Sequence, residues 1–173
     1  MKVSIITATY NSSETILTAV KSVANQTYDN IEHIFIDGKS SDDTIEKIKK
    51  FELSSHVIHS ESDSGIYEAL NKGIAMASGD IVGFLHSDDF FSDENCIQKI
   101  VDTIKNSDSI AVYSDLVYVD RNNTNLVLRY WKSGMYNKKK IANGWMPPHP
   151  TVFIKKSAIE DYYFNLDYRI SAD

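Results

Sequence analysis

Two neighbouring carboxylates, Asp88 and Asp89, come directly after a short run of apolar and small residues, 81–85. A run of this kind predicts a strand that is buried on both faces. In an open parallel sheet, the side chains that follow such a strand lie at the carboxyl edge, where ligands bind. Adjacent carboxylates repel each other, and a divalent cation with oxygen ligands relieves that repulsion. The pair therefore predicts a site for a metal ion or a phosphate group.

A second role for the pair is to cap the helix that follows, because Asp is favoured at helix N-termini. Ser92 and Asp93 lie closer to the start of that helix and can do the capping. We therefore favour the site for a metal ion or a phosphate group.

Polar residues also follow the other predicted strands of the first half, at 9–11, at Asp37 and at Asp63. In a doubly wound sheet these loops share one crevice. The chain has no GxGxxG after its first strand and no GxxxxGK[ST], which argues against a dinucleotide site and a P-loop. A phosphate ligand without a glycine-rich cradle needs a cation, and the aspartate pair can hold one.

The first 90 residues alternate between strands and helices. β-branched and apolar runs predict strands at residues 3–9, 31–36, 56–59 and 81–85. Apolar residues at helical spacing predict a helix between each pair of strands. Short loops and right-handed crossovers make this order a parallel sheet with helices on its faces.

The second half is less regular. We expect a helix over residues 95–105 and a hairpin of two strands, 110–119 and 126–131, which would make the sheet mixed. A long connection, 132–150, leads to a last strand-like piece at 151–154, and connections of that length are often functional.

Composition limits the classes of function. A net charge of −6 without a long basic stripe argues against nucleic acid as a partner. The single cysteine, Cys96, has no internal disulfide partner, which fits a reducing compartment. The N-terminus lacks the pattern of a signal peptide, and no apolar run approaches about 18 residues. We therefore expect a single cytoplasmic domain.

Several spaced motifs occur together in this chain: VSIITATYN at 3–11, IDGKSSDDT at 36–44, and DSGIYEALNKGIAMASGDIVGFLHSDD at 63–89. PHPTVFI follows at 148–154, and the chain ends in Ala172-Asp173. In this order the motifs resemble the family 2 glycosyltransferases. The resemblance implies a GT-A fold, a Rossmann-like three-layer α/β/α arrangement around a mainly parallel, mixed sheet. It divides the domain into a nucleotide-sugar-binding half, about 1–90, and an acceptor-side half, about 91–173.

The resemblance also implies roles for residues in the first half. Four residues at the end of the first strand would line the nucleotide: Thr7, Ala8, Thr9 and Tyr10. The Tyr10 ring would lie against the base, unless it only packs within the fold. Asp37 would accept a hydrogen bond from the base, and Asp63 would line the same pocket, unless it only caps a helix. Many members carry a second acid where this chain has Gly38, so base recognition is expected to differ.

Three acids are implied for the chemistry. Asp88 would face the ribose and the metal, and Asp89 would bind Mn²⁺ or Mg²⁺ directly. Asp173 falls where the family places its catalytic base. Relatives continue through at least one more helix at this point, so we expect the natural protein to extend beyond Asp173.

The function implied is inverting transfer of a sugar from a nucleotide-diphospho-sugar to the hydroxyl of a growing glycan or lipid-linked saccharide. Tyr10 and Asp37 suggest a uracil-sized base and hence a UDP-sugar. One rival is a GT-A domain that binds the nucleotide-sugar with little turnover. A second rival, a nucleotidyltransferase, would need a glycine-rich basic loop after the first strand, and residues 7–11 do not provide one.

The long connection contains three consecutive lysines, 138–140, close to Trp131 and Tyr136. They form either a solvated loop or a contact with an anionic lipid-linked acceptor, which would place the protein peripherally at the inner face of a membrane. His149, between two prolines, either shapes the acceptor side or belongs to a rigid turn. His86 either reaches the metal or has a structural role.

Overall fold

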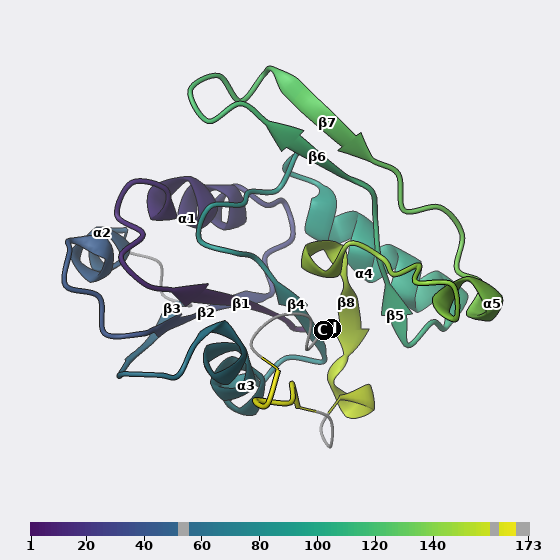
Figure 1. Ribbon diagram of the computed structural model, residues 1–173, viewed down its shortest axis with the longest axis horizontal. Coiled ribbons are helices and arrows are strands. Elements are labelled where there is room, and N and C mark those ends of the chain that lie inside the picture. The colour runs from purple at the N-terminus through teal and green to yellow at the C-terminus, as the bar shows by residue number, and fades with distance from the viewer. Residues whose placement is uncertain (52–55, 160–162, 169–173) are drawn as a thin grey trace.

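The computed structural model describes residues 1–51, 56–159 and 163–168, and its centre is a sheet with helices on both faces (Figure 1). The six strands lie in the order β3-β2-β1-β4-β8-β5. Their bounds are β1 (Val3–Thr9), β2 (Ile31–Asp37), β3 (His56–Ser60), β4 (Ile81–Phe84), β5 (Ala111–Val112) and β8 (Phe153–Lys155). The first four strands are parallel, and β8 is antiparallel to both of its neighbours. The predicted α/β/α architecture with a mainly parallel, mixed sheet is confirmed.

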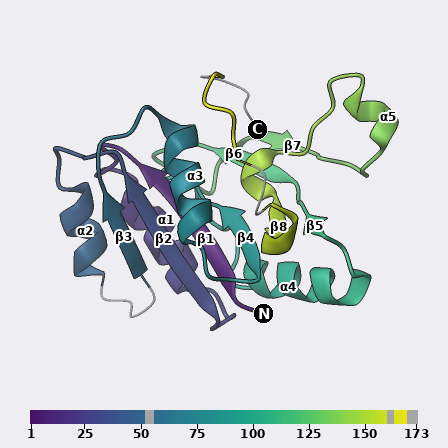
Figure 2. The same cartoon turned by 90° about the horizontal axis from the view of Figure 1, so that it is seen from below.

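Four helices cover the sheet: α1 (Ile16–Ala24), α2 (Thr44–Lys50), α3 (Ile66–Met76) and α4 (Cys96–Ser107). Buried residues of α1, α2 and α4 pack on one face, and those of α3 pack on the other (Figures 1 and 2). The chain steps from β1 to β2 to β3 in one direction and then returns past β1 to β4. Because crossovers between parallel strands are right-handed, the return places α3 on the opposite face.

The predicted hairpin was partly wrong. Residues 110–119 form two strands rather than one, because β5 belongs to the central sheet and β6 (Leu116–Val119) pairs with β7 (Val127–Trp131) in a separate two-stranded sheet. Polar contacts divide the two segments. Ser114 donates its amide to the Thr151 hydroxyl at 3.2 Å, and Asp115 accepts the Ser133 amide at 2.8 Å. The sheet is mixed as expected, but the antiparallel strand is β8.

The long connection contains a short helix, α5 (Lys138–Ile141), and ends in the 3₁₀ turn η1 (His149–Thr151). The predicted strand at 151–154 begins two residues later, as β8, and the 3₁₀ turn η2 (Lys156–Ala158) follows it. None of the helices within the described ranges is long and apolar enough to cross a bilayer.

A glycine in the central strand fixes the position of β8. A Cβ atom at Gly83 would lie 2.1 Å from the ring of Phe153, which is fully buried. Only glycine lets this ring pack directly on the backbone of β4. The contact holds β8, and with it the turn that carries His149, beside the strand that ends at Asp88 and Asp89.

Candidate active site

The loops after β1 and β4 meet at the carboxyl edge of the sheet. The hydroxyls of Ser12 and Ser87 lie 2.9 Å apart, so the first loop is joined to the turn that carries Asp88. β1 and β4 are neighbours, and the chain leaves them toward opposite ends of the sheet. Such a reversal is where open α/β sheets form a ligand crevice.

The loops after β1 and β2 are held together by hydrogen bonds between their tips. Asn11 donates its amide to Ser40 Oγ at 2.8 Å and accepts the Ser41 amide at 2.9 Å through Oδ1. Its backbone is left-handed, with φ 48°, a conformation that Asn tolerates better than most residues. Ser12 donates its amide to Thr44 Oγ1 at 2.9 Å, which adds the start of α2 to the same network.

Asp37 holds this edge together from the inside. Its side chain is fully buried, and it accepts the Ser40 amide at 3.0 Å, the Ser40 hydroxyl at 2.5 Å and the Ser60 hydroxyl at 2.6 Å. The carboxylate is therefore engaged by the loops after β2 and β3. A hydrogen bond from a nucleotide base, as expected from the sequence, would have to replace or share one of these contacts.

Tyr10, Gly38 and Asp63 converge from three different loops. The Tyr10 side chain is 65% exposed. A Cβ atom at Gly38 would lie 3.0 Å from Asp63 Oδ2 and 3.4 Å from the Tyr10 ring, so glycine leaves the space between them open. Asp63 also accepts the Gly65 amide at 3.0 Å, which sets its side chain at the start of α3. An exposed aromatic ring can stack on a flat heterocycle, and a carboxylate beside the ring can accept a hydrogen bond from the N–H of that heterocycle.

The three residues before Tyr10 are largely interior. Thr7 is buried, with its hydroxyl 2.9 Å from His33 Nε2, and Ala8 packs against the core under α3. The Thr9 hydroxyl is buried and has no hydrogen-bond partner among the described residues. Any contact of Thr7, Ala8 or Thr9 with a nucleotide stays a prediction, and it would come from the backbone of this segment more readily than from the Thr7 hydroxyl.

The two adjacent aspartates have different surroundings. Asp88 is exposed, whereas Asp89 is partly buried and donates its amide to the His86 carbonyl at 3.0 Å in a tight turn. Burial and the charge of Asp88 raise the pKa of Asp89 to about 6, although His149 acts in the opposite direction. The His86 and His149 rings lie beside this turn, with their Nε2 atoms 3.0 Å apart.

Asp88 and Asp89 suit a cation that takes its other ligands from water and a substrate. Within the described ranges, no group of three or more His, Cys, Asp or Glu side chains could hold a metal ion without such help. Mg²⁺ is commonly bound by one or two carboxylates together with substrate phosphates. Burial and the neighbouring Asp88 raise the pKa of Asp89, and a bound cation would act in the opposite direction.

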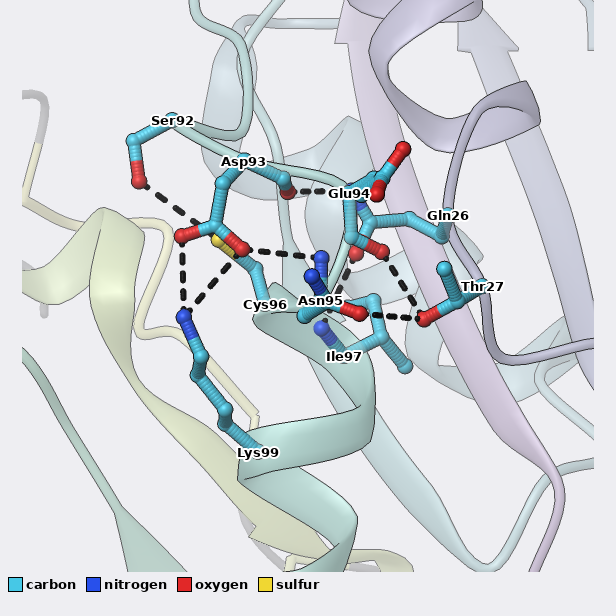
Figure 3. Close-up of polar contacts among 9 residues, drawn as sticks. All are labelled: Gln26, Thr27, Ser92, Asp93, Glu94, Asn95, Cys96, Ile97 and Lys99. Carbon is cyan, nitrogen blue, oxygen red and sulfur yellow. Dashed lines mark hydrogen bonds and ion pairs between the residues drawn. The ribbon is translucent and has the colours of Figure 1, made fainter.

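The helix after the aspartate pair is capped without the pair (Figure 3). Asp93 accepts the amide of Asn95, the residue before α4, at 2.8 Å, and Ser92 Oγ lies 3.5 Å from Cys96 Sγ. Neither of these contacts satisfies an amide of the helix, although the sequence had suggested that they would. Gln26, two residues after α1, accepts the Ile97 amide of α4 at 3.0 Å and donates to the Asp93 carbonyl at 2.9 Å, a role that sequence reasoning missed. Asp88 and Asp89 are thus left available for a ligand.

A cavity of about 470 Å³ lies between α4 and the segment that joins β5 to β6. Aromatic and polar side chains line it, among them Cys96, Lys99, Tyr113, Asp115, Tyr130 and Thr151. It belongs to the half that was expected to bind the acceptor.

The expected catalytic base, Asp173, lies outside the described residues. The described segment 163–168 approaches the same edge from the α3 side. Phe164 exchanges hydrogen bonds of 2.8 and 2.9 Å with Asn71, and its ring packs on Tyr67 and Phe84. This contact brings the chain beside the end of β4 shortly before Asp173.

Residues 4–162 match the family described as Glycosyl transferase family 2. The chain belongs to this family. An uncharacterized glycosyltransferase of Mycobacterium tuberculosis is 33% identical over 178 residues, which cover 99% of this chain and 65% of the relative. A PGL/p-HBAD biosynthesis glycosyltransferase of Mycobacterium bovis is 28% identical over 98% of this chain and 66% of its own length. The chain therefore spans about two thirds of these relatives.

Solved structures confirm the GT-A fold. S. aureus TarS 1–349 in complex with UDP-GlcNAc superposes with a TM-score of 0.76 at 19% identity, over 95% of this chain and 49% of that fragment. The mannosyltransferase PcManGT from Pyrobaculum calidifontis, in complex with GDP-Man and Mn²⁺, gives a TM-score of 0.71 at 18% identity, over 95% of this chain and 47% of PcManGT.

Because the pKa of Asp89 is raised in the folded state, the folded protein should be more stable when this carboxyl is neutral. Asp89→Asn should increase the free energy of unfolding at about pH 7.5 by up to about 3 kcal/mol, since a raised folded-state pKa disfavours the charged form. The gain should shrink as the pH falls through 6, because the parent carboxyl then takes up a proton. Denaturant unfolding across this range measures it, with Glu46→Gln on the exposed side of α2 as the control. A gain that is the same at all pH values would contradict the raised pKa.

Proposed function

We propose that this chain transfers a sugar from a UDP-sugar to an acceptor hydroxyl of a growing glycan or a lipid-linked saccharide, with inversion and with help from Mn²⁺ or Mg²⁺. The observation that carries the proposal is the meeting of an exposed Tyr10 ring, the Asp63 carboxylate and the Asp88–Asp89 pair at one sheet edge. These groups suit the base and the diphosphate of one nucleotide. The UDP-GlcNAc complex of TarS supports a uracil nucleotide, and the Mn²⁺ complex of PcManGT supports a divalent cation.

In this proposal Asp63 recognises the base. The Asp37 carboxylate is committed to Ser40 and Ser60, whereas Asp63 Oδ2 lies over the open space at Gly38 beside the Tyr10 ring. Uracil has an N3–H donor in its plane, and a carboxylate next to a stacking ring can accept it. Asp63 thus provides the acid that this chain lacks at position 38.

Asp88 and Asp89 would hold the cation beside the diphosphate of the donor. When bound, the cation neutralises negative charge that develops on the departing diphosphate. Asp89 is partly buried and its pKa is raised. A bound cation would lower this pKa and so favour the ionised carboxylate.

The acceptor enters from the second half of the chain. The aromatic and polar side chains that line the cavity between α4 and β6 suit a saccharide. Asp173 acts as the general base that removes the proton of the attacking hydroxyl, as the family resemblance implies. Attack on the face of the sugar opposite the diphosphate inverts the anomeric configuration.

Donor binding should depend on the metal. UDP should bind the parent protein more tightly with Mn²⁺ than with a chelator, and Asp89→Asn should remove most of that difference, since the cation loses its direct ligand. Titration calorimetry with UDP, GDP, CDP and ADP measures it, with Glu46→Gln as the control. If UDP binds equally well with and without Mn²⁺, the cation assignment fails. If GDP binds more tightly than UDP, the donor is a GDP-sugar.

Asp63 and Asp37 should respond differently to the same substitution. Asp63→Asn should weaken UDP binding by about 10- to 100-fold, the range for one charge-assisted hydrogen bond, and leave stability nearly unchanged. Asp37→Asn should mainly lower the free energy of unfolding, by about 1–3 kcal/mol, because it disturbs three buried hydrogen bonds. Glu61→Gln, an exposed carboxylate in the same connection as Asp63, is the control. Loss of UDP affinity in the Asp37 variant alone would assign the base contact to Asp37.

Asp173→Asn should act on chemistry and leave donor affinity almost intact. Loss of general-base help lowers transfer by roughly 10²–10⁴-fold. Sugar transfer to a saccharide or lipid-linked acceptor is measured alongside UDP affinity, with Asp167→Asn as a carboxylate control in the same segment. Unchanged transfer in the Asp173 variant would place the base elsewhere. UDP binding without any transfer by the parent chain would support a binding domain instead of a transferase.

A further inference from the structure

Basic residues are concentrated in one stretch of this acidic chain. Residues 121–159 contain eight Lys or Arg and no Asp or Glu, although the whole chain has a net charge of −6. Part of this charge is used within the fold, because Arg121 pairs with Glu14 and Lys155 with Asp108. The three ammonium groups of Lys138–Lys140, on α5, have no carboxylate partner in the part of the chain that the structure describes.

Exposed apolar side chains surround the three lysines. We call residues 134–146 the α5 loop. Met135 is 84% exposed, and Tyr136, Ile141 and Met146 are also exposed. Figures 1 and 2 both place α5 at the periphery of the molecule, away from the central sheet. The exposure continues along β7 into the loop, at Val127, Leu128 and Tyr130.

Specific contacts fix the base of the α5 loop, so its exposed surface is built into the fold. Trp145 donates its indole N–H to the Ser133 carbonyl at 2.9 Å, and its ring packs edge-to-face against Tyr113 and Tyr136. Tyr113 donates its hydroxyl to the Gly134 carbonyl at 3.0 Å. The two ends of the loop are thereby joined to each other and to the end of β5.

We propose that the α5 loop docks the protein on an anionic lipid surface. Lysines bind acidic headgroups, aromatic side chains favour the interfacial region, and Met135 and Ile141 can insert below it. An apolar patch alone would also suit a second copy of the chain. A two-fold contact at this loop would bring the two lysine clusters together, however, and like charges oppose that arrangement. A bilayer with acidic lipids complements both the charge and the apolar side chains.

Docking at this loop would place the carboxyl edge of the sheet close to the lipid surface. The α5 loop leads within three residues to His149, whose ring lies 3.0 Å from His86, next to the turn that carries Asp88 and Asp89. Delivery of a lipid-linked acceptor to this edge rests on the proposed transferase function. The docking itself does not depend on sugar transfer.

Vesicle binding by the whole chain tests the proposal. Cosedimentation is measured with vesicles of phosphatidylcholine alone and with vesicles that also contain phosphatidylglycerol. We expect binding only to the acidic vesicles, with an affinity that falls as salt is added. The triple change Lys138→Gln, Lys139→Gln and Lys140→Gln should weaken binding at least tenfold. The matched control changes three exposed lysines on α1 and α2 to Gln, Lys21, Lys49 and Lys50, and should bind like the parent.

Two further measurements locate the contact. The chain has two tryptophans, so Trp131→Phe leaves Trp145 as a reporter, whose emission should shift to the blue on acidic vesicles. Met135→Ser with Ile141→Ser should weaken binding and reduce that shift, while thermal unfolding and UDP affinity stay at the parent values. UDP affinity thus reports on the proposed function separately from docking.

Three outcomes would overturn the proposal. The first is no binding of the parent to acidic vesicles. The second is equal loss of binding in the α5 triple variant and the control triple variant. The third is a concentration-dependent dimer in sedimentation that Met135→Ser abolishes, because this result would assign the exposed apolar side chains to a second copy of the chain.

Discussion

The reversal of strand order between β1 and β4 is the constraint on which the rest of the structure depends. After β1 the chain forms β2 and then β3 on one side of β1. It then returns to form β4 on the other side of β1. Right-handed crossovers then fix which face each helix covers. The loops after β1 and β4 separate at the carboxyl edge and are joined there by Ser12 and Ser87. Every group assigned to the donor nucleotide follows one of the four parallel strands.

The aspartates of this edge show how one residue type serves both structure and function. Asp37 is fully buried, and serine groups satisfy its oxygens, so it holds the loops in place. Asp89 is partly buried beside another carboxylate, and its pKa is raised to about 6. An ionisable group that its own fold leaves uncompensated is typical of a functional site. His149 compensates this charge in part, and in the proposed function a bound cation would supply the rest.

The two halves of the chain differ in how completely they are packed. The parallel strands and their helices bury nearly all of the core, whereas β6 and β7 form a two-stranded sheet with exposed apolar residues. An isolated two-stranded ribbon has little stability of its own. Here Asp115 closes the ribbon internally through Tyr130 and Ser133. The contacts of Ser114 with Thr151 and of Arg121 with Glu14 join it to the rest of the chain. The carboxyl edge is thus closely hydrogen-bonded, whereas most of the exposed large apolar side chains lie in the second half.

The sequence alone determined the strands and helices of the first 90 residues, because each buried parallel strand is a short apolar run and each helix shows a 3.6-residue period. It also predicted a ligand site at the aspartate pair, since adjacent carboxylates repel each other unless a cation or hydrogen bonds offset them. It did not predict that β8 would pair with β4. That pairing depends on Gly83 accepting the Phe153 ring, a contact between residues 70 positions apart. Only the tertiary structure could show that Asp37 is committed to serines while Asp63 meets Tyr10 across Gly38, because loops from three strands make those contacts. The lysines at 138–140 were visible in the sequence, but their exposure beside Met135 and Ile141 was decided by how the chain folds around Trp145.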